Sequence, residues 1–202
     1  MTTSNGTNAS ERFLTQLART SFLSLWSFPN LFGEPGKELC DLLVVFDQHI
    51  LIFSDKDCAF GNSGNLKTDW DRWYKKAILK SAKQIWGAER WLRANPSNVF
   101  SDAKCTQRLP IVLPDPTVAT IHRILVAHGA SASCKEALGG SGSLMIWSGV
   151  VGDEHLCSNG GTPFAIGQVD PTRGYLHVFD DTTLSIVMST LDTISDFVAY
   201  LG

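Results

Sequence analysis

The segment from Gly36 to Lys56, GKELCDLLVVFDQHILIFSDK, constrains the fold more than any other part of the chain. Two runs rich in β-branched and aromatic residues, LCDLLVVF and HILIFS, flank the polar pair Asp47-Gln48. This pattern is typical of a β-hairpin with a two-residue loop. We therefore expect Phe46 to pair with His49.

The alternation of side chains along a strand assigns the residues of this hairpin to two faces. The first face carries Asp41, Leu43, Val45, Ile50, Ile52, Ser54 and Lys56. The second face carries Leu42, Val44, Phe46, Leu51, Phe53 and Asp55. Both faces are apolar in the middle, which predicts a hairpin inside a sheet that is covered on both sides.

Charged residues stand at the open end of this hairpin. Counting outward from the turn sets Asp41 opposite Ser54 and puts Lys56 on the same face. A buried carboxylate or ammonium group is costly unless it is paired or holds a ligand. The residues alone leave two interpretations open: a structural ion pair between Asp41 and Lys56, and a functional site.

The order of these residues resembles the core of the PD-(D/E)XK nuclease superfamily. In that superfamily one strand presents an aspartate, and the next presents an acidic residue, any residue and a lysine. Asp41 and the triplet Ser54-Asp55-Lys56 match this order, with serine in place of the second acid. The lead-in Gly36-Lys37-Glu38 resembles that of the nuclease-related and Holliday-junction-resolvase-like branches. The resemblance covers about residues 11 to 95.

The resemblance implies an α+β fold, with a restriction-endonuclease-like mixed sheet flanked by helices and a smaller β-rich C-terminal part. We expect four segments: a disordered tail over 1–10, a nuclease-like core over 11–96, a connector over 97–116, and a β-rich half over 117–202. The last segment either completes the core sheet or is appended to it, and a role in homodimer formation stays open.

The resemblance also implies a Mg²⁺ (or Mn²⁺) site that polarises a scissile phosphate. Asp41 would be the central ligand, and Glu38 the second if the regular strand begins after it. The backbone carbonyl of Asp55 would be a third ligand. Its side chain is expected to point to the opposite face.

Three further residues complete the implied site. Lys56 would orient or deprotonate the attacking water. Ser54 would be a weak substitute for the missing acid, acting through a water molecule. Gln84 matches a polar position on the helix that follows the lysine strand; a buried glutamine bonded to backbone is the alternative.

A long amphipathic helix is predicted from about Asp69 to Ala94, with Thr68 as N-cap and Asn95-Pro96 as its stop. The segment from Lys67 to Arg93 holds eight Lys and Arg against three acids, a charge of +5, while the rest of the chain is −8 (9 − 17). One helical stripe carries Arg72, Lys76, Lys80, Lys83 and Arg90. The opposite face carries Trp70, Tyr74, Ala77, Ile85, Ala88 and Leu92.

Two interpretations of this stripe stay open. Lys76, Lys80 and Lys83 are candidates for binding nucleic-acid phosphates, with DNA favoured. The alternative is a solvated outer face.

The other expected elements are less distinctive. They are an amphipathic helix over 11–27 that ends before the hairpin, a strand over 117–129, a flexible loop over 131–142, a strand over 143–151, a second hairpin formed by 163–169 and 175–179, and helices starting near 180 and 191.

Composition narrows the functional classes. The net charge of −3 argues against a uniformly basic nucleic-acid binder, and no apolar run reaches membrane-spanning length. Five cysteines without metal-ligand spacing predict reduced thiols and a cytoplasmic location. The leading hypothesis is a metal-dependent nuclease. The alternatives are a catalytically degenerate nuclease-like fold that binds nucleic acid or protein, and a purely structural protein.

Overall fold

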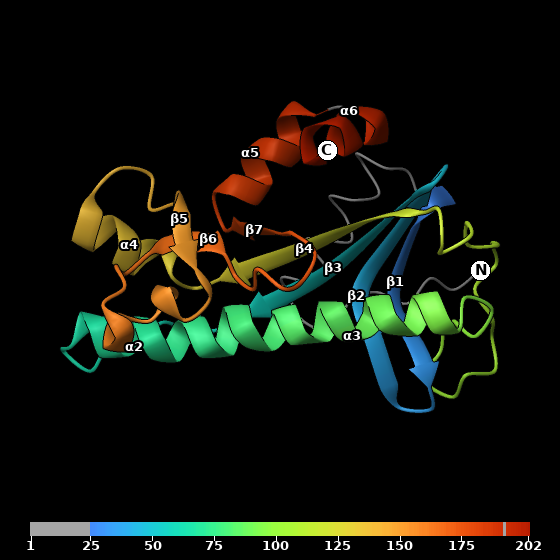
Figure 1. The fold of residues 1–202 in the computed structure, drawn as a ribbon, viewed down its shortest axis with the longest axis horizontal. Helices are drawn as coiled ribbons and strands as arrows, with labels where there is room; N and C mark the ends of the chain where they lie inside the picture. The colour runs from blue at the N-terminus through green and yellow to red at the C-terminus, as the bar shows by residue number, and fades with distance from the viewer. Residues whose placement is uncertain (1–24, 192) are drawn as a thin grey trace.

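The computed structural model describes residues 25–191 and 193–202, and its centre is a five-stranded mixed sheet (Figure 1). The strand order is β1-β2-β3-β4-β7. The strands are β1 (Ser27–Glu34), β2 (Lys37–Phe46), β3 (His49–Asp57), β4 (Thr120–His128) and β7 (Leu176–Asp180). Strand β2 runs antiparallel to both β1 and β3, while β4 is parallel to both β3 and β7. The predicted α+β class with a mixed sheet is therefore confirmed.

The β2–β3 hairpin has the predicted register. Phe46 pairs with His49, and the pairing continues to Leu42 opposite Phe53. Asp47 takes the positive φ of 50° that the tight turn requires. The two predicted faces enter two separate buried clusters: Leu43, Val45, Ile50 and Ile52 in one, and Leu42, Val44, Leu51 and Phe53 in the other.

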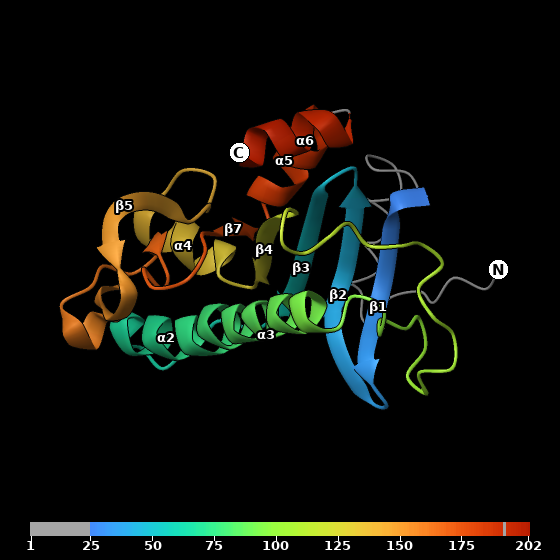
Figure 2. The same ribbon diagram turned by 45° about the vertical axis from the view of Figure 1, so that its right-hand side comes forward.

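Helices cover both faces of the sheet, as the two apolar faces predict (Figures 1 and 2). One face packs against a continuous helix made of α2 (Leu66–Trp73), a π-helical segment (Tyr74–Leu79) and α3 (Lys80–Ala94). The other packs against α5 (Thr183–Thr190) and α6 (Ile194–Leu201). Among the described residues, no helix is long and apolar enough to span a bilayer.

The long helix begins earlier than predicted. Its N-cap is Asn65, whose side-chain oxygen accepts a hydrogen bond from the backbone N–H of Thr68 at 3.0 Å. Thr68 therefore lies inside the first turn. The predicted end is correct, because Asn95 is the C-cap.

The expected helix over 11–27 is helical at Leu25 and Trp26, where the structure describes it, but the strand that follows was not predicted. Ser27 starts strand β1, which pairs with β2 through the two-residue turn Pro35-Gly36, where Gly36 has a φ of 72°. Pro29 and Gly33 obscured this strand, since both residues are rare in strand interiors. The expected tail 1–10 and most of the expected helix 11–27 lie outside the described residues.

The C-terminal half contains two further corrections. The expected loop over 131–142 holds helix α4 (Ser131–Leu138). The expected second hairpin does not form, because β6 (Ala165–Gln168) pairs in parallel with β5 (Met145–Val151) in a separate two-stranded sheet, while β7 joins β4. Short 3-10 helices at Gly152–His155 and Cys157–Asn159 lie between β5 and β6.

Candidate functional site

The open end of the β2–β3 hairpin brings Asp41 and Asp55 together through the backbone. A carboxylate oxygen of Asp41 accepts a hydrogen bond from the backbone N–H of Asp55 at 2.6 Å, and Asp41 is only 8% exposed. Ser54 is 1% exposed and Lys56 is half-buried. Lys56 takes part in none of the ion pairs within the described ranges. The structural Asp41–Lys56 ion pair is therefore not formed.

The side chain of Asp55 turns to the opposite face, as predicted. One of its carboxylate oxygens lies 2.6 Å from Nε2 of His128, and Nδ1 of His128 lies 2.6 Å from a carboxylate oxygen of Asp181. The Ser131 hydroxyl donates to Asp181 at 2.9 Å, and the Gly129 N–H donates at 3.2 Å. Asp55, His128 and Asp181 thus form a buried-to-exposed chain across the ends of β3, β4 and β7.

His128 is the positively charged member of this row of three hydrogen-bonded side chains. Burial lowers the pKa of its imidazole, but hydrogen bonds and charge from Asp181 and Asp55 more than offset this and raise the pKa to about 10. Both ring nitrogens then donate to carboxylates at neutral pH. His128 is therefore a clamp between two carboxylates and has no free nitrogen to accept a proton from a substrate.

Sequence reasoning missed His128 and Asp181 because they lie 53 residues apart and on different strands. One signal was available. His128 closes β4 and Asp181 directly follows β7, and the carboxyl ends of neighbouring parallel strands meet at one edge of a sheet.

The remaining predicted ligands lie apart. Glu38 is exposed near the start of β2. Burial raises the pKa of the Cys40 thiol, and the nearby carboxylates of Asp41 and Glu38 raise it further, which marks this strand end as negatively charged. Gln84 is half-buried on α3 and forms no hydrogen bond to any residue of 25–191 or 193–202 that would tie it to Asp41.

These residues do not fit the two-carboxylate Mg²⁺ site that the resemblance implies. Ser54 supplies no carboxylate, and the Asp55 carboxylate is engaged by His128 on the other face. Across the described part of the chain, no group of three or more His, Cys, Asp and Glu side chains is arranged to hold a metal ion.

The long helix carries the second candidate site, a surface that we call the cationic face. It is defined by five exposed side chains: Arg72, Lys76, Lys80, Lys83 and Arg90. None of the five takes part in an ion pair with another residue that the structure describes. In both views this helix lies on the opposite side of the sheet from α5 and α6 (Figures 1 and 2). The predicted apolar face of the helix is buried.

The three acids of the helix point into the protein instead. Asp69 accepts from the backbone N–H of Ser63 at 2.8 Å. Asp71 accepts from the N–H of Cys157 at 2.6 Å. Hydrogen bonds from backbone N–H groups outside the helix therefore occupy the carboxylates of both Asp69 and Asp71.

Glu89 is the third acid, and it forms a bidentate pair with Arg123 of β4 at 2.5 and 2.6 Å. Burial raises the pKa of Glu89, but the bonds from Arg123 and Arg93 more than offset this and lower it. The helix thus keeps its negative charges inside and shows its positive charges to solvent.

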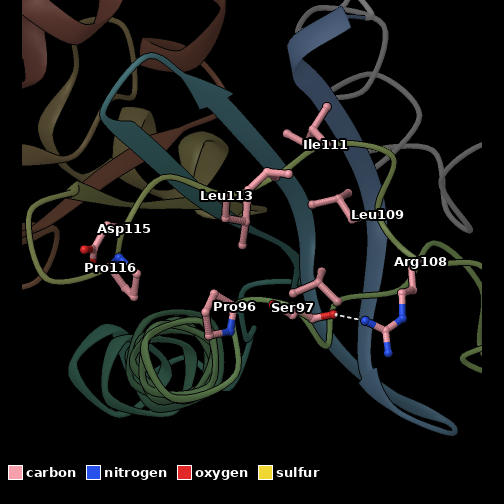
Figure 3. Close-up of a pocket in the computed structure, with 10 residues that line it drawn as sticks. Pro96, Ser97, Arg108, Leu109, Ile111, Leu113, Asp115 and Pro116 are labelled. Carbon is pink, nitrogen blue, oxygen red and sulfur yellow. Dashed lines mark hydrogen bonds between the residues drawn. The ribbon is translucent and has the colours of Figure 1, made fainter.

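A separate cavity of about 470 Å³ lies between the end of α3 and the segment 108–116 (Figure 3). Its lining is mainly apolar and includes Leu109, Ile111 and Leu113. Arg108 at its rim donates to the carbonyl oxygen of Ser97 at 3.0 Å. None of the predicted site residues lines this cavity.

Comparison of the chain with protein-family models, curated proteins and solved structures gives no match. The chemistry of the two candidate sites is therefore the ground for a functional proposal.

Proposed function

We propose that this chain binds nucleic acid through its cationic face, on a nuclease-like scaffold whose cation site is incomplete. The observation that carries the proposal is the one-sided charge of the long helix. The five side chains of the cationic face have no ion-pair partner among the described residues, whereas the three acids of the helix are bonded inward. A solvated helix with no partner would be expected to mix both signs on its outer face.

The dimensions of the cationic face suit a nucleic-acid backbone. From Arg72 to Arg90 the helix advances roughly 27 Å at 1.5 Å per residue. Duplex DNA carries about one charge per 1.7 Å of its axis, so such a face lies along many phosphates at once. Lys and Arg side chains gain affinity there by releasing condensed counterions. This mode of binding needs no base-specific contact.

The strand order is consistent with a nuclease-like scaffold. The strand of Asp41 and the strand of Lys56 are neighbours, and the long helix follows the second directly. Phosphodiester hydrolysis is the second candidate function, favoured by Asp41 and Lys56 lying at one end of this hairpin. The serine at position 54 and the turned Asp55 carboxylate favour binding over hydrolysis.

The test compares two triple variants that remove the same charge. Lys76→Gln/Lys80→Gln/Lys83→Gln changes the cationic face, and Lys37→Gln/Lys104→Gln/Lys135→Gln changes exposed lysines elsewhere. Fluorescence anisotropy with a labelled 20-base-pair DNA duplex at low salt reports binding. We expect the first variant to lose at least about tenfold in affinity and the second to lose little. Equal losses would contradict the proposal.

A cleavage assay separates the two functions. The same duplex, single-stranded DNA and RNA are incubated with Mg²⁺ or Mn²⁺, with Asp41→Asn as the matched variant. We expect retention of the nucleic acid without cleavage. Cleavage that disappears in Asp41→Asn would establish the nuclease instead.

A further inference from the structure

The cavity between the end of α3 and the segment 108–116 has an apolar floor that belongs to the core. Val99 and Leu113 are buried members of the cluster that packs against the long helix, and the half-buried Leu109 and Ile111 pack against that cluster. The volume of about 470 Å³ falls within the roughly 300–1,000 Å³ that small-molecule sites occupy. Apolar side chains that line such a hollow favour a ligand with an apolar body.

The walls of this cavity are fixed before any ligand enters. At the start of the segment 108–116, the N–H of Leu109 donates to the carbonyl oxygen of Val99 at 2.8 Å. At its end, the Arg93 guanidinium donates to the carbonyl oxygen of Pro116. The segment also contains three prolines, which restrict its backbone further. A ligand therefore meets a preformed site and loses little affinity to ordering of the protein.

One positively charged side chain stands at the rim of the cavity. The Arg108 guanidinium donates to the carbonyl oxygen of Ser97 at 3.0 Å (Figure 3). It also lies over the Phe100 ring, 5.9 Å from the ring centroid. Arg108 takes part in none of the ion pairs among residues 25–191 and 193–202. A guanidinium has five N–H donors in a planar fork, so this held side chain keeps donors for an oxyanion.

A negatively charged side chain stands at the opposite end of the lining. Figure 3 shows Asp115 on the far side from Arg108. Its Oδ1 accepts hydrogen bonds from the backbone N–H of Thr117 at 2.8 Å and from the Thr117 hydroxyl at 2.7 Å. These bonds lower the pKa of the Asp115 carboxyl, which is therefore an anion at neutral pH. The two ends of the cavity thus differ in sign, and an anionic group is favoured only at the Arg108 end.

We propose that this cavity binds a small monocarboxylate with an apolar body, with the carboxylate on Arg108 and the body along Leu109 and Ile111. One guanidinium matches the single charge of a carboxylate in bidentate geometry. A phosphate monoester would bring a second negative charge into a cavity that already holds Asp115. The cavity shares no residue with the cationic face, so the inference does not depend on nucleic-acid binding.

The test titrates octanoate and octanol into the protein, below the concentration at which octanoate forms micelles, and follows backbone and methyl resonances by NMR. Octanol has an apolar chain of the same length without the charge. Arg108→Gln removes the positive charge but keeps an amide that can donate to Ser97. Lys104→Gln is the matched control, because Lys104 is an exposed cation that does not line the cavity.

We expect octanoate to shift the resonances of the apolar lining residues in the unaltered protein. Arg108→Gln should weaken octanoate binding by about tenfold or more, since a hydrogen-bonded charge is lost, and should change octanol binding by less than about twofold. Arg108→Lys keeps the charge and should retain most of the affinity for octanoate. Lys104→Gln should bind octanoate as the unaltered protein does. The Tm of each variant confirms that it is folded.

Three results would overturn the assignment. The first is the absence of octanoate binding to the folded, unaltered protein at millimolar concentrations. The second is an equal affinity of Arg108→Gln and the unaltered protein for octanoate, or an equal loss for octanol. The third is a set of shifted resonances that leaves out the lining residues. If sedimentation also showed a stable dimer in that case, the cavity would be covered by a second copy of the chain.

Discussion

The carboxylate of Asp41 accepts a hydrogen bond from the backbone N–H of Asp55, its neighbour across the open end of the β2–β3 hairpin, at 2.6 Å. The regular pairing of the two strands ends one residue earlier, at Leu42 and Phe53. The Asp41 side chain thus continues the ladder where the backbone pairing stops. This hydrogen bond gives the buried Asp41 carboxylate a structural role at the strand end.

Asp41→Ala should destabilise the fold, because it leaves the N–H of Asp55 without an acceptor in a buried position. We expect a loss of about 1–3 kcal/mol in the free energy of unfolding, measured by urea titration. Asp41→Asn keeps an acceptor oxygen, so its free energy of unfolding should fall clearly less than that of Asp41→Ala. Equal losses in the two variants would show that the hydrogen bond does not carry the effect.

The His128 clamp predicts a loss of stability at alkaline pH. The pKa of His128 is raised to about 10 in the folded chain, against the usual 6.5 in the unfolded one. Its stabilisation is complete below pH 6.5 and falls as the pH rises toward 10, since the folded state holds a proton that the unfolded state has released. Urea unfolding between pH 6 and 10 should show this decline, and His128→Gln should flatten it.

Asp181 sets the lower limit of the same clamp. Burial raises its pKa, but bonds from His128, Ser131 and the Gly129 N–H more than offset this and lower it. Its stabilisation is present above pH 3.8 and falls as the pH drops below that value. If the free energy of unfolding of His128→Gln still declined between pH 6 and 10 as steeply as that of the unaltered protein, the clamp would be contradicted.

His122 predicts a pH dependence of the opposite sign. Its pKa is lowered to about 4 in the folded chain, chiefly by burial, so between pH 6.5 and 4 the unfolded state binds the extra proton. The stabilisation is complete above pH 6.5 and is lost as the pH falls toward 4. Thermal unfolding of His122→Gln should lack this acid slope while keeping the alkaline decline of His128. A slope that persists in His122→Gln would assign the acid sensitivity to other groups.

A local element was predictable where the sequence pattern that defines it lies within one continuous segment. The β2–β3 register follows from the turn at Asp47 and the alternation of apolar side chains. The apolar side of the long helix follows from its period, although the π-helical segment Tyr74–Leu79 widens the buried stripe to include Ile78. The face assigned to Asp55 was also correct, because alternation is strict along a regular strand.

Contacts between distant segments were not predictable in the same way. The segments 163–169 and 175–179 satisfy a local hairpin pattern, yet β6 and β7 pair with β5 and β4. A parallel pairing leaves no turn signal in the sequence. The same reason hides the hydrogen bond between His49 and His122 and the one between His128 and Asp181, because these residues meet only after β3, β4 and β7 are aligned.

The dependence of DNA affinity on salt tests the account most directly, because each phosphate contact contributes about −0.9 to the slope of log K against log[salt]. The duplex is titrated at several salt concentrations with the unaltered protein and with the two triple lysine variants. Loss of Lys76, Lys80 and Lys83 should make the slope less steep by roughly 2 to 3, while loss of Lys37, Lys104 and Lys135 should change it by less than about 1. An unchanged slope in the first variant, or an equal change in both, would show that the cationic face does not hold the phosphate backbone.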